Sequence, residues 1–131
     1  MRKGRKELLI DRMNKIPTDA KSLTFLNAAI ITAHGTFKFQ KLLLKEAREI
    51  VAEFKDGNRK IQSAIGHAAT AELMTMLLKF PVPQNRIDFV QRTEDAALVF
   101  KLKKRAPEGV VLTREELEEI GYELGLLTRS A

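Results

Sequence analysis

The 131-residue sequence contains no cysteine and no tryptophan, and only two histidines. Without cysteine the chain has no disulfide framework, no thiolate nucleophile and no thiolate metal ligand. With His34 and His67 as the only imidazoles, we expect no metal site and no cofactor. No apolar run approaches the roughly 20 residues that span a bilayer, and the N-terminus lacks the apolar block of a signal peptide. We therefore expect a cytoplasmic protein without a membrane partner.

The charge is biased in one direction. Lysine and arginine number 23 against 17 aspartate and glutamate residues, which gives a net charge of +6. This excess favours a polyanionic partner but does not distinguish duplex DNA from RNA or from a small phosphate ligand. Seven Phe and one Tyr leave few rings for stacking the bases of a long single strand. The 44% hydrophobic and 31% charged residues are typical of one soluble globular domain.

The chain divides into a short appendage and one domain. Residues 2–16 are predicted to form a basic helix that ends at Pro17, and a helix of this length buries little surface by itself. We therefore treat residues 1–22 as a basic N-terminal appendage. Residues 23–131 are expected to form a single domain.

Apolar periodicity predicts the elements of this domain. The apolar run at 23–31 indicates a strand covered on both faces, and the alternation at 37–40 predicts a second strand that pairs with it as a hairpin. Helical spacing predicts helices within 43–54 and 67–80. The short segment 61–65 is expected to be extended.

The C-terminal half continues this mixed pattern. Alternation predicts strands at 87–89 and 98–102, joined as a hairpin. Thr113 and Glu116 form a capping box that begins a helix, which is expected to end near Gly125. The sum is an α+β fold with a mixed sheet of four or five strands and two or three helices, mainly on one face.

The segment Ser63–His67, with the sequence SAIGH, lies at a predicted strand-to-helix turn. Such a turn directs free backbone N–H groups and the positive end of the helix dipole at one point, which suits a phosphate. Gly66 would allow a phosphate to approach the backbone, and His67 is the only side chain nearby of a type that titrates near neutral pH. The alternative is an ordinary surface histidine in the first turn of a helix.

The loop Gln84–Arg86 is a second candidate. The Arg86 guanidinium could bind a phosphate through two parallel hydrogen bonds, and Asn85 could bond a sugar or a base edge. The alternative is a polar rim without a ligand.

A basic row at every second residue is the third candidate. Lys101, Lys103 and Arg105 would lie on one face of a strand, where a polyanion could bind. Lysines on an edge strand also prevent aggregation, and this explanation has equal weight for the two lysines. Arg105 and Glu108 form either a local ion pair or part of a site. His34 is expected in a surface turn.

The segments FLNAAIITAHGTF, IQSAIGHAAT, PVPQNR, LVFKLKKRAPEG and EEIGYELGLLTR together resemble the viral and phage-type ring nucleases. These are small proteins of archaeal viruses, phages and mobile elements that act as anti-CRISPR proteins against type III systems, or their host-encoded counterparts. The resemblance covers about residues 24–129. It implies a mixed sheet with helices, a symmetric homodimer, and metal-independent cleavage of cyclic tetra-adenylate to linear di-adenylate with a 2′,3′-cyclic phosphate.

The resemblance also implies roles for individual residues. His67 corresponds to the family's histidine and would act as the general acid, with Arg105 stabilising charge and Glu108 orienting the imidazole. Arg86 corresponds to a second arginine that would hold a phosphate or ribose. Viral members carry a serine just after the first strand, where this chain has Asn27 followed by Ala28, Ala29 and Ile30. We expect substrate contacts from Asn27, Ser63, Gly66, Asn85, Arg86 and Lys103.

The expected partner is therefore cyclic tetra-adenylate, with no stable DNA partner. A different class of function stays open: a non-catalytic nucleic-acid-binding regulator, or a sponge that sequesters cyclic oligonucleotides. The basic strand supports that alternative, whereas His67 and the absence of helix-turn-helix or RNA-recognition signatures count against it.

Overall fold

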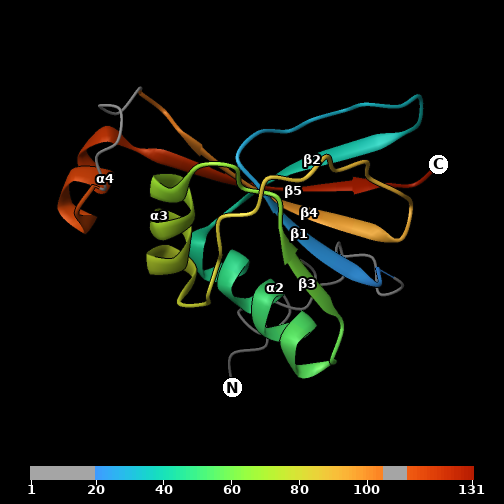
Figure 1. Cartoon of the computed structure of the whole chain (residues 1–131), viewed down its shortest axis with the longest axis horizontal. Helices are drawn as coiled ribbons and strands as arrows, with labels where there is room; N and C mark the ends of the chain where they lie inside the picture. The colour runs from blue at the N-terminus through green and yellow to red at the C-terminus, as the bar shows by residue number, and fades with distance from the viewer. Residues whose placement is uncertain (1–19, 105–111) are drawn as a thin grey trace, which may run out of the picture.

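A computed structural model describes residues 20–104 and 112–131 (Figure 1). This part forms one mixed sheet with three helices, which confirms the predicted α+β single domain. The strands are β1 (Ser22–Leu26), β2 (Phe37–Leu42), β3 (Lys60–Ser63), β4 (Asp95–Leu102) and β5 (Tyr122–Arg129). The helices are α2 (Leu44–Asp56), α3 (Ala68–Leu78) and α4 (Arg114–Ile120).

The sheet has the strand order β2-β5-β4-β1-β3. β1 is parallel to both β3 and β4, whereas β5 is antiparallel to β4 and β2. The C-terminal ends of β1, β3 and β4 therefore meet along one edge, which we call the carboxyl edge. In open sheets with parallel strands, ligands commonly bind outside this edge.

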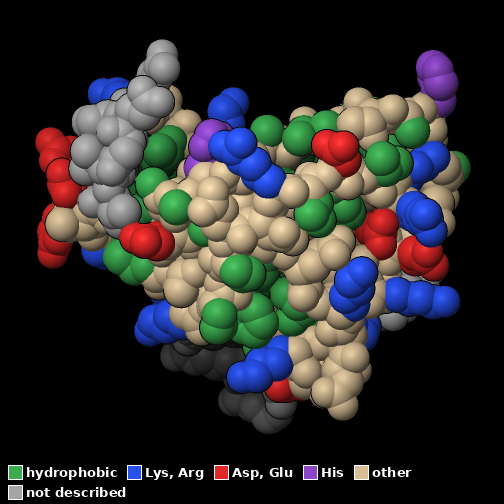
Figure 2. Space-filling view, viewed as in Figure 1, with side chains coloured by type: hydrophobic (Ala, Val, Ile, Leu, Met, Phe, Trp, Pro, Cys, Tyr) green, Lys and Arg blue, Asp and Glu red, His purple; other side chains and the backbone are tan. Residues whose placement is uncertain are grey.

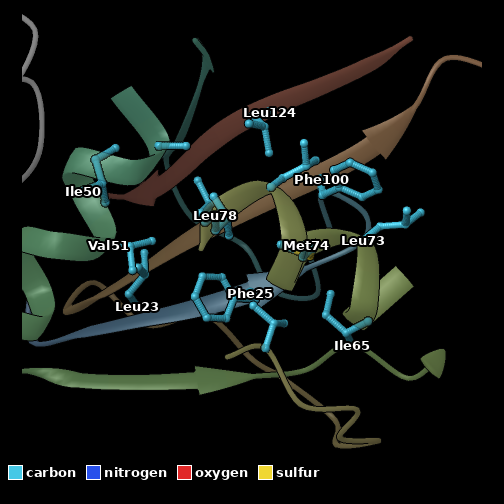
Figure 3. Packing of buried hydrophobic residues seen from close by; sticks show 14 of the residues in the cluster. Leu23, Phe25, Ile50, Val51, Ile65, Leu73, Met74, Leu78, Phe100 and Leu124 are labelled. Carbon is cyan, nitrogen blue, oxygen red and sulfur yellow. The ribbon is translucent and has the colours of Figure 1, made fainter. Parts of the chain in front are cut away.

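The helices cover one face of the sheet (Figures 1 and 3). The apolar residues of α2 that were predicted at helical spacing are all buried: Ala47, Ile50, Val51 and Phe54. They pack with α3 residues such as Met74 and with the inward side chains Leu23 and Phe25 of β1. Burying each of these large apolar side chains contributes roughly 1.5–3 kcal/mol to folding.

The opposite face, which we call the open face, has only a small apolar cluster. Leu26, Ala97, Val99 and Leu127 form this cluster, and the half-buried Phe89 of the loop before β4 packs against it. Phe39 of β2 is paired with Leu127, so it lies on the same face, and it is 56% exposed. The helices are thus mainly on one face, as predicted.

The described fold begins before residue 23. Ala20 is buried, and its carbonyl accepts a hydrogen bond from Arg59 at 3.0 Å. Ser22 opens β1 and donates its hydroxyl proton to the Asp95 carboxylate at 2.5 Å. Residues 20–22, assigned from the sequence to the appendage, are thus packed with the domain.

The predicted pairing of the first two strands is wrong. β1 ends at Leu26 and not at Ile31, and it is enclosed by β3 and β4, so neither of its edges is free for β2. β2, whose residues are half-buried or exposed, instead forms an outer strand next to β5.

The predicted strand at 87–89 is also absent. Residues 81–92 are irregular, with Ile87 exposed, and the side chains of Asn85 and Gln91, not a ladder of backbone bonds, attach this segment to β3, β4 and β5. The final helix is shorter than predicted. It begins at the Thr113–Glu116 capping box, as expected, but ends at Ile120 because Gly121 adopts a φ of 87°. β5 follows and fills the place in the sheet that the missing strand would have taken.

Candidate functional site

Several of the residues singled out from the sequence lie along the carboxyl edge. Asn27 follows β1 directly, Ser63 ends β3, and Lys103 follows β4. Because the three strands run parallel, their C-terminal ends point to the same side of the sheet although the residues are far apart in the sequence. The register pairs Phe25 with Ser63, so the ends of β1 and β3 are level, whereas β4 continues three residues beyond Val99, the partner of Leu26, and Lys103 lies further out.

The turn from Ser63 to His67 is fixed to the end of β1. The backbone N–H of Ala64 donates to the Phe25 carbonyl at 3.0 Å, and Ile65 is fully buried. Ser63 is only 2% exposed, and its hydroxyl oxygen accepts a hydrogen bond from the Ile65 N–H at 3.1 Å. This bond shapes the turn, a role different from the substrate contact expected for Ser63.

The loop containing Gln84, Asn85 and Arg86 docks on this turn. The Asn85 backbone N–H donates to the Ile65 carbonyl at 2.8 Å, and its side-chain amide donates to the Ser63 carbonyl at 2.8 Å. The two sequence motifs thus form one unit. The Asn85 amide that was expected to meet a sugar or base is bonded to the protein.

Arg86 lies on Gly66. Its Nε donates to the Gly66 carbonyl at 3.2 Å, and the Gln84 amide donates to the same carbonyl at 2.9 Å. A Cβ atom at position 66 would lie 3.1 Å from Arg86 Cγ. The sequence predicts that a phosphate can approach the backbone at Gly66. On the side where a Cβ would lie, the Arg86 side chain occupies this space.

His67 is the N-cap residue of α3, with φ −117° and ψ 125°. Its carbonyl accepts the first helical hydrogen bond from Ala71 at 3.0 Å, while its side chain makes no capping bond. The imidazole is exposed and has no hydrogen-bond partner within the described ranges. It thus stands free beside the N–H groups of the first turn, where the helix dipole is positive.

Lys101 and Lys103 lie at the C-terminal end of β4. Lys101 is paired with Glu123 and lies on the open face. Lys103 comes after the strand and its aliphatic part lies over Gly121, where a Cβ would be 3.0 Å from its Cδ. Its backbone N–H donates to the Gly121 carbonyl at 2.9 Å. Lys103 shares a pocket with Lys41 and Glu123, and both of these residues also line the pocket around Lys101. Arg105 and Glu108 lie outside the described residues.

A pocket of about 530 Å³ opens on the open face next to Asn27. Gly125 and Val99 form its floor, and Phe39 forms a wall whose ring would be 2.4 Å from a Cβ at position 125. Lys41, Lys101 and Glu123 supply charge there, and Ala28 and Ala29 line the side near the carboxyl edge. The sequence analysis missed Phe39, Lys41, Glu123 and Gly125; the glycine inside an apolar strand pattern was the available signal.

A larger pocket lies elsewhere in the described part of the chain. It measures about 880 Å³ and surrounds the N-terminal ends of β1 and β3, with Lys60, Asp88, Arg92 and Asp95 on its walls. Its charges are mixed, and Asp95 is bonded to Ser22 and to the Arg92 N–H. It lies away from the carboxyl edge, so we centre the site on His67. In residues 20–104 and 112–131, no three His, Cys, Asp or Glu side chains form a group able to hold a metal ion.

Charged side chains at the carboxyl edge include cations without an ion pair. Figure 2 shows Lys and Arg side chains scattered over the face that it presents, with hydrophobic and acidic side chains among them. No carboxylate within the described ranges forms an ion pair with Arg86 or Lys103.

None of the helices in the described ranges has the length and apolarity needed to cross a membrane.

The family model described as STIV B116-like matches residues 23–124. The chain belongs to this family. It is 37% identical over 107 residues to the protein YddF of Bacillus subtilis (strain 168), covering 82% of this chain and 96% of that protein. It is also 35% identical over 111 residues to ORF117 of Acidianus two-tailed virus, covering 82% and 92% of the two chains.

Members of this STIV B116-like family thus occur in a bacterium and in a virus. Among solved structures, B116 of Sulfolobus turreted icosahedral virus superimposes with a TM-score of 0.67, over 82% of this chain and 98% of that chain. The sequence identity is 20%, so this likeness shows the shared fold. The matched region contains His67, Arg86 and both segments of the docked unit.

Proposed function

We propose that this protein is a metal-independent ring nuclease. It cleaves cyclic tetra-adenylate to linear di-adenylate with a 2′,3′-cyclic phosphate and thereby switches off type III CRISPR signalling in the cytoplasm of the host cell. The observation that carries the proposal is the exposed, unbonded imidazole of His67 at the start of α3, on the turn to which Arg86 is docked. The resemblance of the segments around His67, Arg86, Arg105 and Glu108 to ring nucleases supports it.

The reaction needs little from the protein. The ribose 2′-oxygen attacks the adjacent phosphorus, the bond from phosphorus to the 5′-oxygen breaks, and the 2′-hydroxyl loses its proton. The 5′-oxygen must gain a proton as it leaves. Orientation, charge stabilisation and that proton are thus the protein's contributions, and neither a water nucleophile nor a metal is required.

In this proposal His67 donates the proton to the 5′-oxygen. The Arg86 guanidinium binds a phosphate or ribose, and Arg105 stabilises the phosphorane. The role of Arg105, which lies outside the described residues, rests on the resemblance alone. Lys103 adds positive charge at the same edge.

Glu108 has a supporting role in the proposal. The positive end of the α3 dipole disfavours a cation at its N-terminus, so a carboxylate is needed to keep an imidazolium there. Glu108 would orient His67 and favour its charged form. In the principal version the proton of the 2′-hydroxyl goes to solvent water, and in the alternative Glu108 takes that proton directly.

A homodimer completes the proposed site. A cyclic tetra-adenylate includes a two-fold axis among its symmetries, and one small domain offers too little concave surface to enclose it. A symmetric dimer would place two copies of His67 around one ring. The exposed large apolar side chains outside the helices support such an interface: Ile30, Ile31, Phe39, Leu43, Ile87 and Val90.

The alternative is a non-catalytic binding protein, either a nucleic-acid-binding regulator or a sponge for cyclic oligonucleotides. The cations Lys41 and Lys101 around the open-face pocket favour it, because they could hold a polyanion without any chemistry. No stable DNA partner is part of the principal proposal.

One experiment separates the two functions. Rings of four and six adenylates are incubated with the protein and EDTA, and the products are resolved by chromatography. Conversion of the four-membered ring to di-adenylate supports the nuclease. Recovery of intact ring bound to the protein supports the sponge and contradicts the nuclease.

A further inference from the structure

We propose that Gly66 and Asn85 are positioning residues that hold the Arg86 guanidinium at the carboxyl edge, and that neither acts by contacting the substrate. This inference rests on the proposed function, because it gives Arg86 its role in binding a phosphate. It changes the interpretation of two residues that the sequence alone assigned to substrate contact.

Gly66 acts through the space that it leaves. A Cβ there would lie 3.1 Å from Arg86 Cγ, 3.6 Å from Nε and 3.9 Å from Cδ. The first distance is closer than ordinary van der Waals contact, so with an alanine at position 66 the arginine side chain would have to shift by a few tenths of an ångström. The glycine is not needed for backbone conformation, since the only glycine with positive φ in the described ranges is Gly121. The side chain nearest to a Cβ at position 66 is therefore that of Arg86.

The Gly66 carbonyl acts on the same side chain. It accepts from Arg86 Nε at 3.2 Å, which leaves the two terminal guanidinium nitrogens without a hydrogen bond to any described residue. Since a guanidinium binds a phosphate through two N–H groups, an arginine held by one nitrogen still has a bidentate edge to offer. Arg86 is exposed, so this edge is accessible to solvent.

Asn85 fixes the backbone that carries Arg86. Asn85 directly precedes the arginine, and it donates two hydrogen bonds of 2.8 Å, one to the Ile65 carbonyl and one to the Ser63 carbonyl. On its other side, Gln84 bonds to the Gly66 carbonyl. The loop is thus attached to the turn at three consecutive residues, which reduces the freedom that Arg86 would otherwise lose on binding a ligand.

The first test is a double-mutant cycle. Single-turnover cleavage of cyclic tetra-adenylate is measured for Gly66→Ala, Asn85→Ala and Arg86→Ala, and for each of the first two combined with Arg86→Ala. We expect Gly66→Ala to slow cleavage roughly tenfold to hundredfold, because a displaced binding group loses the alignment on which the rate depends. In the Arg86→Ala background the same change should have almost no effect. A full effect in both backgrounds would show that Gly66 acts on the ligand directly and would overturn the proposal.

The second test needs no ligand. The Nε–H signal of Arg86, assigned in a 15N–1H spectrum, should exchange more slowly with water than those of arginines without an Nε hydrogen bond. Gly66→Ala and Asn85→Ala should each accelerate this exchange. Gly57→Ala is the matched control: its Cβ would lie 3.3 Å from Arg59 Nε, at the end of α2, and should leave the Arg86 signal unchanged.

The two tests fail separately. If the wild-type protein cleaves no ring but the Arg86 signal responds to Gly66→Ala, the proposed function is wrong and the positioning role holds. If cleavage occurs but neither variant alters the signal, the positioning role is wrong. Should Gly66→Ala fail to fold, Asn85→Ala is judged by the same signal and the same cycle.

Discussion

Polar side chains at the carboxyl edge fall into two groups. Ser63 and Asn85 are bonded to backbone groups of the turn and its loop, whereas the His67 imidazole and the terminal nitrogens of Arg86 are left open to solvent. A side chain that is already bonded to the backbone has fewer hydrogen-bonding sites left for a ligand than one that is not. The open group is therefore where we expect direct contact with the substrate.

His67→Ala should lower the cleavage rate by roughly 10²- to 10⁴-fold, the usual contribution of general acid–base catalysis, and leave ring binding largely intact. Single-turnover rates and equilibrium binding of the ring measure the two effects. His34→Ala is the control, because His34 is also exposed and its side chain makes no hydrogen bond in the described part of the chain. Cleavage by the His67 variant at the wild-type rate would disprove the general-acid role.

Arg105→Ala should reduce both ring binding and cleavage rate, because a phosphate contact made before and during the reaction serves both. Lys101→Ala should mainly weaken binding, and by less at high salt, since Lys101 is exposed on the open face and its charge is screened. Titrations at two salt concentrations and single-turnover rates compare the variants. Equal effects would indicate a diffuse basic surface and contradict a defined site.

At the scale of elements, α3 and the segment that follows it are joined by one side chain. The Thr75 hydroxyl accepts a hydrogen bond from the Val82 N–H at 2.9 Å and donates to the Ala71 carbonyl at 2.9 Å. Arg48 of α2 also donates to the Leu77 carbonyl at the end of α3 at 2.8 Å. These bonds fix where the chain leaves the helix and hence where the loop containing Arg86 begins.

Thr75→Val should lower the free energy of unfolding by roughly 1–3 kcal/mol, because the buried Val82 N–H would lose its partner while the side-chain volume is kept. Urea denaturation measures the change. Thr70→Val is the matched control on the same helix, since Thr70 is half-buried and its side chain makes no hydrogen bond in the described ranges. Equal losses in the two variants would show that the hydroxyl of Thr75 contributes nothing.

At the scale of the whole molecule, the sheet is asymmetric. Three helices cover one face, while the open face has a small cluster and the exposed ring of Phe39. Apolar surface of this kind, outside the core of a small protein, is typical of an association surface. A symmetric association would also give the proposed ring two identical sites on opposite linkages.

Sedimentation or light scattering should therefore report a dimer of about twice 14.8 kDa that binds one cyclic tetra-adenylate. Cutting at both sites should give two di-adenylates through a linear tetra-adenylate intermediate, which a chromatographic time course would detect. An active monomer that binds one ring per chain would contradict this assembly.

The sequence by itself determined the local elements. The spacing of Ala47, Ile50, Val51 and Phe54 predicts α2 because a helix places residues of that spacing on one face, and all four are buried. The Thr113–Glu116 capping box predicts the start of α4 because both of its hydrogen bonds join residues three apart. Such features depend on residues that are close in the sequence, so they can be predicted without knowledge of the fold.

Only the tertiary structure decided how these elements combine. β2 pairs with β5 because β1 has a partner on both edges, and the chain after Gly121 forms β5 because its alternating apolar residues face the core on one side and the open face on the other. The site follows the same rule. The sequence indicates Ser63–His67 and Gln84–Arg86 as two separate candidates. The hydrogen bond between Arg86 and Gly66 joins residues 20 apart, so it depends on how the chain folds back and not on a local sequence pattern.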